Sequence, residues 1–390
     1  MLRHALRLRC LARNISDRFF AAPVVGGGHV HSLETAVLAE ADEVSFFARQ
    51  RHRGLPTIRI FQVEHQLPMH GGCAGSHALF ATDRTTQEST EPGPNAQETP
   101  QEAAYAYWAL AGMHASIAAP HFIFPEEATV VLFAQAALPI DPVQIEIIRM
   151  LGTGYVAASV SMLALKAGAE RRKLHKSVYR RLNMGVATFA TAALAAEVLH
   201  VDLLEITASI GMATVLGITV AVPSYYYAMT SGHALGLWSI MKGLVRDLDM
   251  LGRVKNGKGL AYALLTPAFY GAGLACMLTP EESLTNVFLS ARGEDCITLW
   301  RMFGASLLML PTWTASLKEA ADRMHLDRPP YITLNMGLVL IGLLNVAILS
   351  PWWTRYSAGP VMPLMLGTWA AAAVVGVWGE LTPTSADPVT

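Results

Sequence analysis

Charged residues are scarce in this chain. Asp, Glu, Lys and Arg make up only 15% of its 390 residues, and apolar residues make up 52%, whereas soluble domains carry about 25% charged residues. The net charge at pH 7 is −1, and there is no basic aromatic groove or nucleic-acid motif. The composition therefore excludes a nucleic-acid-binding protein and indicates a membrane protein whose first partner is the lipid bilayer.

Cysteines and the common catalytic motifs are also few. The four cysteines, Cys10, Cys73, Cys276 and Cys296, have no CxxC spacing, so we expect no disulfide framework. The chain has no GxGxxG, P-loop, GxSxG or HExxH motif. We therefore favour a non-catalytic protein without a cofactor, although membrane enzymes stay open.

The chain contains many long apolar runs. A membrane-spanning helix needs about 20 mostly apolar residues, and several runs of that length contain no Asp, Glu, Lys or Arg. The sequence predicts an all-α polytopic membrane protein with eight transmembrane helices. They are expected at residues 104–123, 147–165, 182–201, 206–225, 260–278, 299–317, 332–350 and 360–379.

The apolar region repeats itself. "FPEEATVVLF" (124–133) matches "TPEESLTNVF" (279–288) at an offset of 155, and the offset then becomes 152. At that offset Arg149 matches Arg301, and Leu-Asn-Met-Gly occurs at 182–185 and again at 334–337. Such periods indicate a duplication. We expect two parallel four-helix units, residues 103–227 and 259–380, since an even number of helices keeps both units in one direction.

Loop charges agree with this topology. Basic residues gather in the turns after the second helix of each unit and in a linker at 228–258, which we expect to be amphipathic, while acidic residues gather in the opposite loops. Basic loops stay on the side from which helices insert. Both termini should therefore lie on the basic side. The uncharged run at 206–241 is interpreted as one helix followed by an interfacial segment, because a second span there would break the parity.

The first 102 residues and the last ten have a different character. Residues 1–25 contain five arginines and no acid before Asp17, which is typical of an organelle presequence. We expect the mitochondrial inner membrane, with a plastid or secretory-pathway membrane as alternatives. Residues 26–102 are polar and expected to be partly disordered, and their histidines and cysteine fit no zinc-finger spacing, so no metal site is predicted. Residues 381–390 form a tail.

Two acidic pairs and two arginines form the most repeated charged pattern. Each unit has Pro-Glu-Glu after its first helix and an arginine at the start of its second. An arginine near the hydrocarbon boundary needs a partner. The pattern predicts a structural ion pair between helices or, alternatively, an anion site. Its members are Glu126, Glu127 and Arg149 in the first unit, and Glu281, Glu282 and Arg301 in the second.

The repeated tetrapeptide places Asn183 and Gly185, and Asn335 and Gly337, at the start of each third helix. Asparagine can bond to a neighbouring helix and glycine permits close approach, so we expect these residues to serve helix packing.

Three histidines of the first unit are the candidate cofactor ligands. His114 and His121 are seven residues apart on one helix face, and His200 ends the third helix on the same membrane side. Such imidazoles could bind a haem iron or a metal, or could only hydrogen-bond their neighbours. Glu197, near the end of the same third helix, could serve proton movement or extend to the acidic-side surface.

The order of segments resembles a known family. A helix, Pro-Glu, an arginine start such as "IIRMLGTGYVAA" or "LWRMFGASLLML", a basic turn and two more helices resemble small four-helix DoxX-like membrane proteins over residues 104–380, about twice one such protein. The resemblance implies a four-helix fold and no particular activity. We expect a non-catalytic subunit, an assembly factor or a small-solute pathway, with other membrane subunits or a solute as partners. The alternatives are a transporter with a site at the unit interface and a membrane oxidoreductase with a histidine-bound cofactor.

Overall fold

The computed structural model describes residues 100–133, 140–231, 251–289, 293–355 and 359–381. Within these residues the chain is helical, and extended backbone pairs only in an isolated bridge between Phe133 and Leu204. The helices are α3 (Pro100–Ile123), α4 (Pro125–Leu132), α5 (Pro142–Glu170), α6 (Ser177–Leu199), α7 (Ile206–Ser231), α9 (Gly257–Leu278), α10 (Pro280–Phe288), α11 (Glu294–Leu307), α12 (Leu310–Asp322), α13 (Pro329–Arg355) and α14 (Met362–Glu380). The expected presequence, nearly all of the polar segment after it, the centre of the linker and most of the tail lie outside these ranges.

Local signals in the sequence explain where several helices begin. The Asp141 side chain accepts a hydrogen bond from the Val143 amide at 2.8 Å at the start of α5, and the Asn256 side chain accepts one from the Gly259 amide at 2.7 Å at the start of α9. The two Pro-Glu-Glu motifs open the short helices α4 and α10. Proline suits a first turn because its missing N–H would have no partner there, and glutamates suit the positive end of the helix dipole. The repeated motif therefore marks a helix start.

Six of the helices are long and apolar enough to cross a membrane: α5, α6, α7, α9, α13 and α14. Their apolar surface points outward as well as inward. Only 22% of the most apolar window of α7 is buried inside the protein. Since a soluble protein rarely exposes so much contiguous apolar surface, the fold is that of a multi-pass helical membrane protein.

The two remaining predicted segments lie in helices outside this group of six. Segment 104–123 lies in α3, and segment 299–317 is divided between α11 and α12. The break comes just before Pro311, which lies in the first turn of α12. Proline has no N–H to bond the carbonyl of Leu307 four residues earlier, and its ring crowds that carbonyl. One apolar run therefore gives two short helices.

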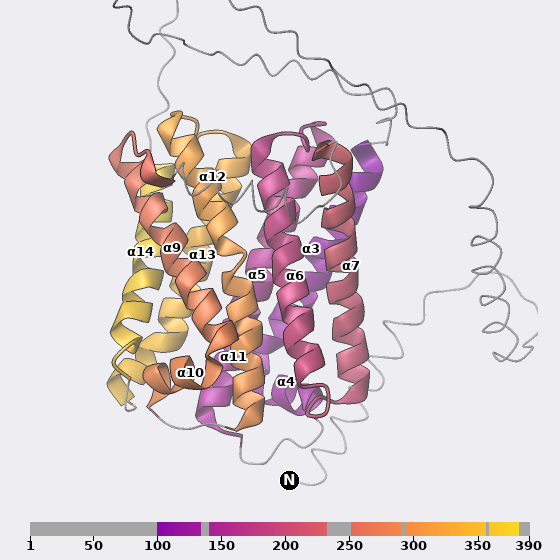
Figure 1. Ribbon diagram of the computed structural model, residues 1–390, viewed down its shortest axis with the longest axis vertical. Helices are drawn as coiled ribbons and strands as arrows, with labels where there is room; N and C mark the ends of the chain where they lie inside the picture. The colour runs from indigo at the N-terminus through magenta and orange to yellow at the C-terminus, as the bar shows by residue number, and fades with distance from the viewer. Residues whose placement is uncertain (1–99, 134–139, 232–250, 290–292, 356–358, 382–390) are drawn as a thin grey trace, which may run out of the picture. The chain divides into compact units, whose positions relative to one another are not determined.

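The helices of residues 100–231 lie beside those of residues 251–381, as Figure 1 shows in indigo to magenta and in orange to yellow. Within each set, the first helix packs along the second and the third along the fourth. The second and third helices also contact the opposite set. α5 packs on α13 and α11, and α6 packs on α11 and α12, whereas α5 and α6 touch little. The two sets of helices thus form one interleaved bundle.

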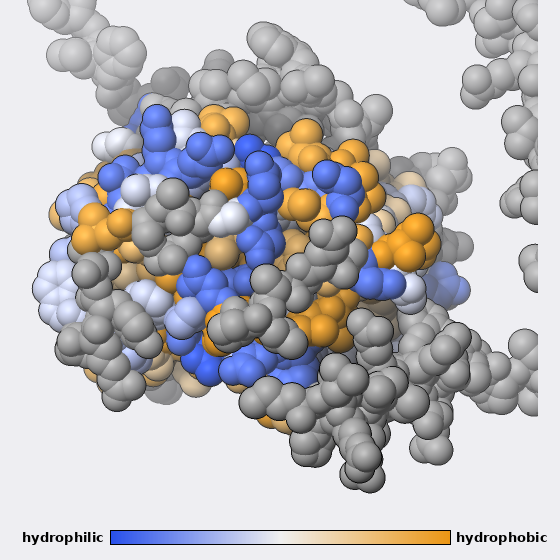
Figure 2. All heavy atoms as spheres, turned by 90° about the horizontal axis from the view of Figure 1, so that it is seen from below, coloured by the Kyte–Doolittle hydropathy of each residue, from blue (hydrophilic) through white to orange (hydrophobic). Residues whose placement is uncertain are grey.

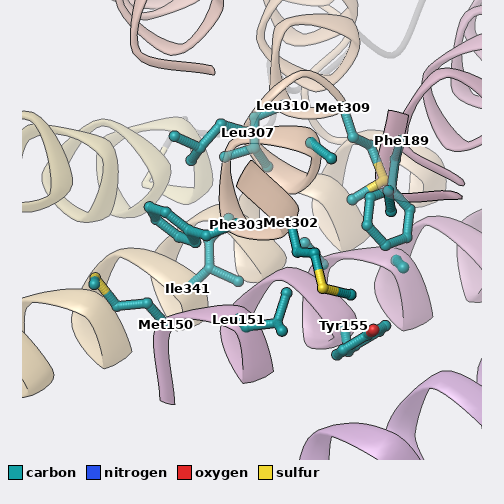
Figure 3. Packing of buried hydrophobic residues seen from close by; sticks show 14 of the residues in the cluster. Met150, Leu151, Tyr155, Phe189, Met302, Phe303, Leu307, Met309, Leu310 and Ile341 are labelled. Carbon is teal, nitrogen blue, oxygen red and sulfur yellow. The ribbon is translucent and has the colours of Figure 1, made fainter. Parts of the chain in front are cut away.

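The centre of this bundle is apolar and tightly packed. Figure 3 shows Met150, Leu151 and Tyr155 of α5 near Phe303 of α11 and Ile341 of α13. Close crossing of the helices depends on small side chains, because a Cβ added to Gly154 would lie 2.5 Å from the Cβ of Ser306.

One end of the bundle carries α4 and α10, at the bottom of Figure 1. Figure 2 looks at this end and shows hydrophilic residues gathered across it. The glutamates of the two Pro-Glu-Glu motifs, Glu126, Glu127, Glu281 and Glu282, are all exposed. This end is therefore suited to face water.

Candidate functional site

A line of polar side chains runs along the inward face of α3. Tyr107, His114 and His121 follow one another at intervals of seven residues and are buried. Seven residues are about two helical turns and rise about 10.5 Å along the axis. The three rings therefore extend through roughly 21 Å of the bundle, a large part of the ~30 Å hydrocarbon thickness.

The first of these rings is tied to the repeated tetrapeptide. The Tyr107 hydroxyl donates a hydrogen bond to Oδ1 of Asn183 at 2.7 Å, and the Tyr262 hydroxyl donates the same bond to Oδ1 of Asn335 at 2.6 Å. All four side chains are buried. Each bond joins a first helix to a third helix of the same set.

The glycines of the two tetrapeptides lie against the opposite set of helices. A Cβ added to Gly185 would clash with the side chain of Thr312, and one added to Gly337 would lie 2.7 Å from Cγ1 of Val160 and 2.7 Å from the Trp313 ring. Each third helix can therefore approach the second helix of the other set only because these positions lack a side chain.

An aromatic ring separates the two histidines of α3. The Tyr155 ring lies 5.8 Å from that of His114 and 5.5 Å from that of His121, measured between ring centroids. On its other side, His114 shares a hydrogen bond of 3.0 Å between its Nε2 and Oγ1 of Thr219 on α7. His121 shares one of 2.7 Å between its Nδ1 and the Ile117 carbonyl of its own helix. The two imidazoles are thus held by different partners.

A buried carboxylate lies at the α4 end of this line. Glu197 is only 2% exposed, and its Oε1 accepts a hydrogen bond from Oγ of Ser209 at 2.8 Å. Of the two roles considered for this side chain, extension to the surface does not fit such burial. Tyr107, Asn183, His114, Thr219, Tyr155, His121, Glu197 and Ser209 are called the polar file below.

Four polar atoms of the polar file have no hydrogen-bond partner in the structure. They are Nδ1 of His114, Nε2 of His121, Nδ2 of Asn183 and Oε2 of Glu197, and each is buried. Buried polar atoms are nearly always bonded to protein or to water. The polar file therefore contains polar atoms along its length that could each form a further hydrogen bond.

The second set of helices has no such file beyond its first ring. Tyr262 matches Tyr107, but the positions that match the remaining rings and the carboxylate are apolar or weakly polar. Phe269 and Cys276 stand where the first set has His114 and His121, and Leu307 and Leu349 stand where it has Tyr155 and Glu197. The difference between the two sets is thus concentrated in the polar file.

His200 lies apart from the other two candidate ligands. It follows the last residue of α6, and its Nε2 contacts Nη1 of Arg301 in the middle of α11. Burial and the Arg301 guanidinium lower the pKa of His200 below its ordinary value, while Glu294, whose carboxylate is 3.9 Å from Nδ1, and Asp202 raise it. A neutral His200 that accepts a hydrogen bond from Arg301 fits these surroundings.

The two arginines have other partners than the sequence predicts. Arg149 pairs with Glu146, one turn earlier on α5, at 2.8 Å, and Arg301 contacts His200. The expected partners Glu126, Glu127, Glu281 and Glu282 are exposed in the first turns of α4 and α10, where the helix dipole already accommodates them. Among the described residues, the predicted clamp is therefore replaced by a local pair and by a contact between α6 and α11.

The described part of the chain brings together no group of three or more His, Cys, Asp or Glu side chains that could hold a metal ion. Neither of its two described hollows is lined by a histidine. One, of about 10 Å³, lies at the crossing of α5 and α11, and the other, of about 190 Å³, lies at the start of α9. The histidine-rich stretch before residue 100 lies outside the described residues.

Sequence reasoning missed half of the polar file. Tyr107, Tyr155, Thr219 and Ser209 were not candidates, although the seven-residue interval from Tyr107 to His114 and His121 could have indicated the first of them. The others come from α5 and α7, and only the packing of these two helices against α3 and α6 brings them there.

Comparison with known proteins finds no family model that matches the chain and no significant match among curated proteins.

Proposed function

We propose that the protein is an eight-crossing membrane protein built from two tandem four-helix repeats, with α3 and the α11–α12 pair as the additional crossings. The bonds Tyr107–Asn183 and Tyr262–Asn335 support the duplication, because both partners recur at the offsets of the sequence repeat. We also propose that each repeat resembles one small four-helix DoxX-like protein. The arginine-rich residues 1–25 support the mitochondrial inner membrane as its location.

Contacts at the centre of the bundle support parallel repeats. Gly154 meets Ser306, and Ser161 bonds Trp313, and both pairs are 152 residues apart. A residue meets its own counterpart only near a two-fold axis. With both repeats running in one direction, this axis would lie along the membrane normal.

The function that the geometry supports best is a proton pathway through the first repeat. The observation that carries this proposal is the polar file, whose side chains can form hydrogen bonds or titrate. At four of the corresponding positions the second repeat has apolar or weakly polar residues. Ionisable residues within a membrane bundle are costly to bury and mark proton relays and ion pathways. The unpartnered nitrogens and oxygen of His114, His121 and Glu197 provide sites where a proton could be received or released.

The size of the passage favours a proton over a larger solute. Neither the hollow at the crossing of α5 and α11 nor that at the start of α9 touches a histidine or Glu197, and protons need no hollow, because they pass along side chains and single waters. A transport site at the interface between repeats receives less support, because the hollow there, about 10 Å³, is close to the smallest that can hold one water.

Proton flux into liposomes tests the pathway. The purified full-length protein would be reconstituted around a trapped pH-sensitive dye, and flux would be driven by a potassium diffusion potential. The variants His114→Phe and Glu197→Leu carry the residues of the second repeat. We expect each to lower the flux by about tenfold or more, since positioned proton-transfer groups contribute factors of about 10² or more.

Tyr262→Phe is the matched control, because it removes the equivalent hydrogen bond of the second repeat and leaves the polar file intact. Its flux should equal that of the unchanged protein. Unchanged protein that conducts no better than empty liposomes would overturn the pathway and leave a non-catalytic subunit or assembly factor as the function. An absorption spectrum of the same preparation tests the oxidoreductase alternative.

A further inference from the structure

An apolar hollow lies at the rim of the bundle, where α9 begins and α12 and α14 end. Its volume is about 190 Å³, and it is lined by residues 256–258, Ala321, Met324, Leu326 and Trp378. An apolar cavity of about 150 Å³ takes up a molecule the size of benzene. The hollow is therefore large enough for several carbons of a lipid chain.

The hollow faces the outside of the bundle at a level suited to the membrane interface. Met324 and Trp378 are exposed side chains, and tryptophan concentrates where hydrocarbon meets water. Nζ of Lys258 lies 5.8 Å from the centroid of the Trp378 ring. A cation thus lies at the edge of an apolar surface.

Met324 is unusual both in conformation and in exposure. Its φ is 57°, and it follows α12 in a turn in which the His325 amide donates to the Ala320 carbonyl. The first repeat has the same turn, with Arg172 at φ 54° and the Lys173 amide bonded to the Gly168 carbonyl. The left-handed region is unfavourable for a side chain in both repeats, but only the second repeat exposes an apolar one there.

Charges around the hollow favour an anion. Lys258 lies in the first turn of α9, where helix N–H groups point toward an anion, and the Lys255 amide bonds Asp322 beside it. The nearby carboxylates are engaged in ion pairs: Asp322 with Lys318 at 2.7 Å and Glu319 with Arg323 at 2.6 Å. These pairs balance one another, whereas residues 253–258 add three basic residues and no acidic one, so the rim carries a basic surplus.

We propose that this hollow binds one anionic phospholipid, with acyl carbons against Met324 and Trp378 and the phosphate at Lys258 and the start of α9. Basic pockets between transmembrane helices are suited to anionic headgroups. The inference does not depend on the proton pathway, because none of these residues belongs to the polar file.

Native mass spectrometry of the full chain tests the site. The protein would be equilibrated in detergent with equal amounts of phosphatidylglycerol and phosphatidylcholine of identical chains. We expect one phosphatidylglycerol to be retained in preference to phosphatidylcholine. Lys258→Gln should lower the ratio of the bound to the free form by about fivefold, the effect of one basic residue at an anionic surface. Trp378→Ala, which removes part of the apolar lining, should lower it as well.

Trp108→Ala is the matched control, since Trp108 is an exposed tryptophan of α3 that does not line the hollow. It should leave the ratio unchanged, and thermal unfolding would verify that each variant is folded. Equal retention of both lipids would overturn the proposal. Equal losses in Trp108→Ala and Trp378→Ala would also overturn it, because they would show ordinary surface lipid. If Trp378→Ala does not fold, Lys258→Gln decides.

Discussion

Trp313 donates a hydrogen bond from its Nε1 to Oγ of Ser161 at 2.8 Å, and the two residues are 152 positions apart. The sequence repeats at this offset. The bond joins α5 to α12 at the centre of the bundle, where both side chains are buried. A few residues away, Gly154 and Ser306 make the closest crossing of α5 and α11 at the same offset. Equivalent positions of the chain thus hold the two sets of helices together.

We expect Gly154→Ala to destabilise the fold by about 1–3 kcal/mol. The new Cβ would lie 2.5 Å from the Cβ of Ser306, and overpacking of a tight core has costs of this size. Thermal unfolding in detergent measures the effect. Gly112→Ala is the control, because nothing lies within 4 Å of that position, and alanine should there be neutral or slightly stabilising.

A second substitution, Ser306→Gly, separates crowding from other causes. Combined with Gly154→Ala, it should recover part of the lost stability, since contacting residues are coupled by about 0.5–3 kcal/mol. Strictly additive effects of the two changes would contradict the close crossing.

The two tyrosine–asparagine bonds should contribute equally to stability. Tyr107→Phe and Tyr262→Phe each remove one buried hydrogen bond of 2.6–2.7 Å between a first and a third helix. We expect each to cost about 0.6–1.7 kcal/mol, as for polar contacts between membrane helices. Resistance to denaturation by detergent would measure both. A loss in only one variant would show that the repeats do not share this contact.

Much of the fold follows from the sequence because helices in a membrane have a simple signature. Seven of the eight predicted apolar segments fall almost wholly within one helix, and apolar length locates the six helices that are long and apolar enough to cross a membrane. The break before Pro311 and the pairing of α5 with α13 were not predicted. Apolar length says where a helix lies, but only side-chain sizes at particular positions, such as Gly337 against Val160, decide which helix it packs on.

The candidate site was less accessible to sequence reasoning. His114 and His121 were identified from their spacing on one helix, and both lie in the polar file. His200 was grouped with them because it ends a helix on the same side, yet its partner is Arg301. Rotation of a helix end and the reach of a long side chain settle such contacts, and neither is encoded in residue spacing.

The buried ion pair between α6 and α12 should be sensitive to the loss of its carboxylate charge. Nη1 of Arg181 contacts Oε2 of Glu319, and their side chains are only 7% and 12% exposed. We expect Glu319→Gln to lower the unfolding free energy by about 3–5 kcal/mol, because it removes the carboxylate charge that faces a buried guanidinium. Glu170→Gln is the control, since Lys166–Glu170 is far more exposed, and its effect should stay below about 1 kcal/mol. Equal losses in both variants would contradict the importance of burial.

Stability should fall on acidification because of His200. Burial and Arg301 lower its pKa in the folded protein, so below about pH 6.5, the ordinary value, the unfolded chain binds more protons than the folded one. The unfolding free energy then decreases as pH falls from 7 to 5 and is recovered as pH rises. His200→Gln keeps a hydrogen-bond acceptor for Arg301 but cannot be protonated, so the melting temperature should depend less on pH. His175→Gln, a change at an exposed histidine, should keep the full dependence. The same dependence in all three proteins would show that His200 binds protons equally well in the folded and unfolded states, and that the α6–α11 contact senses no proton.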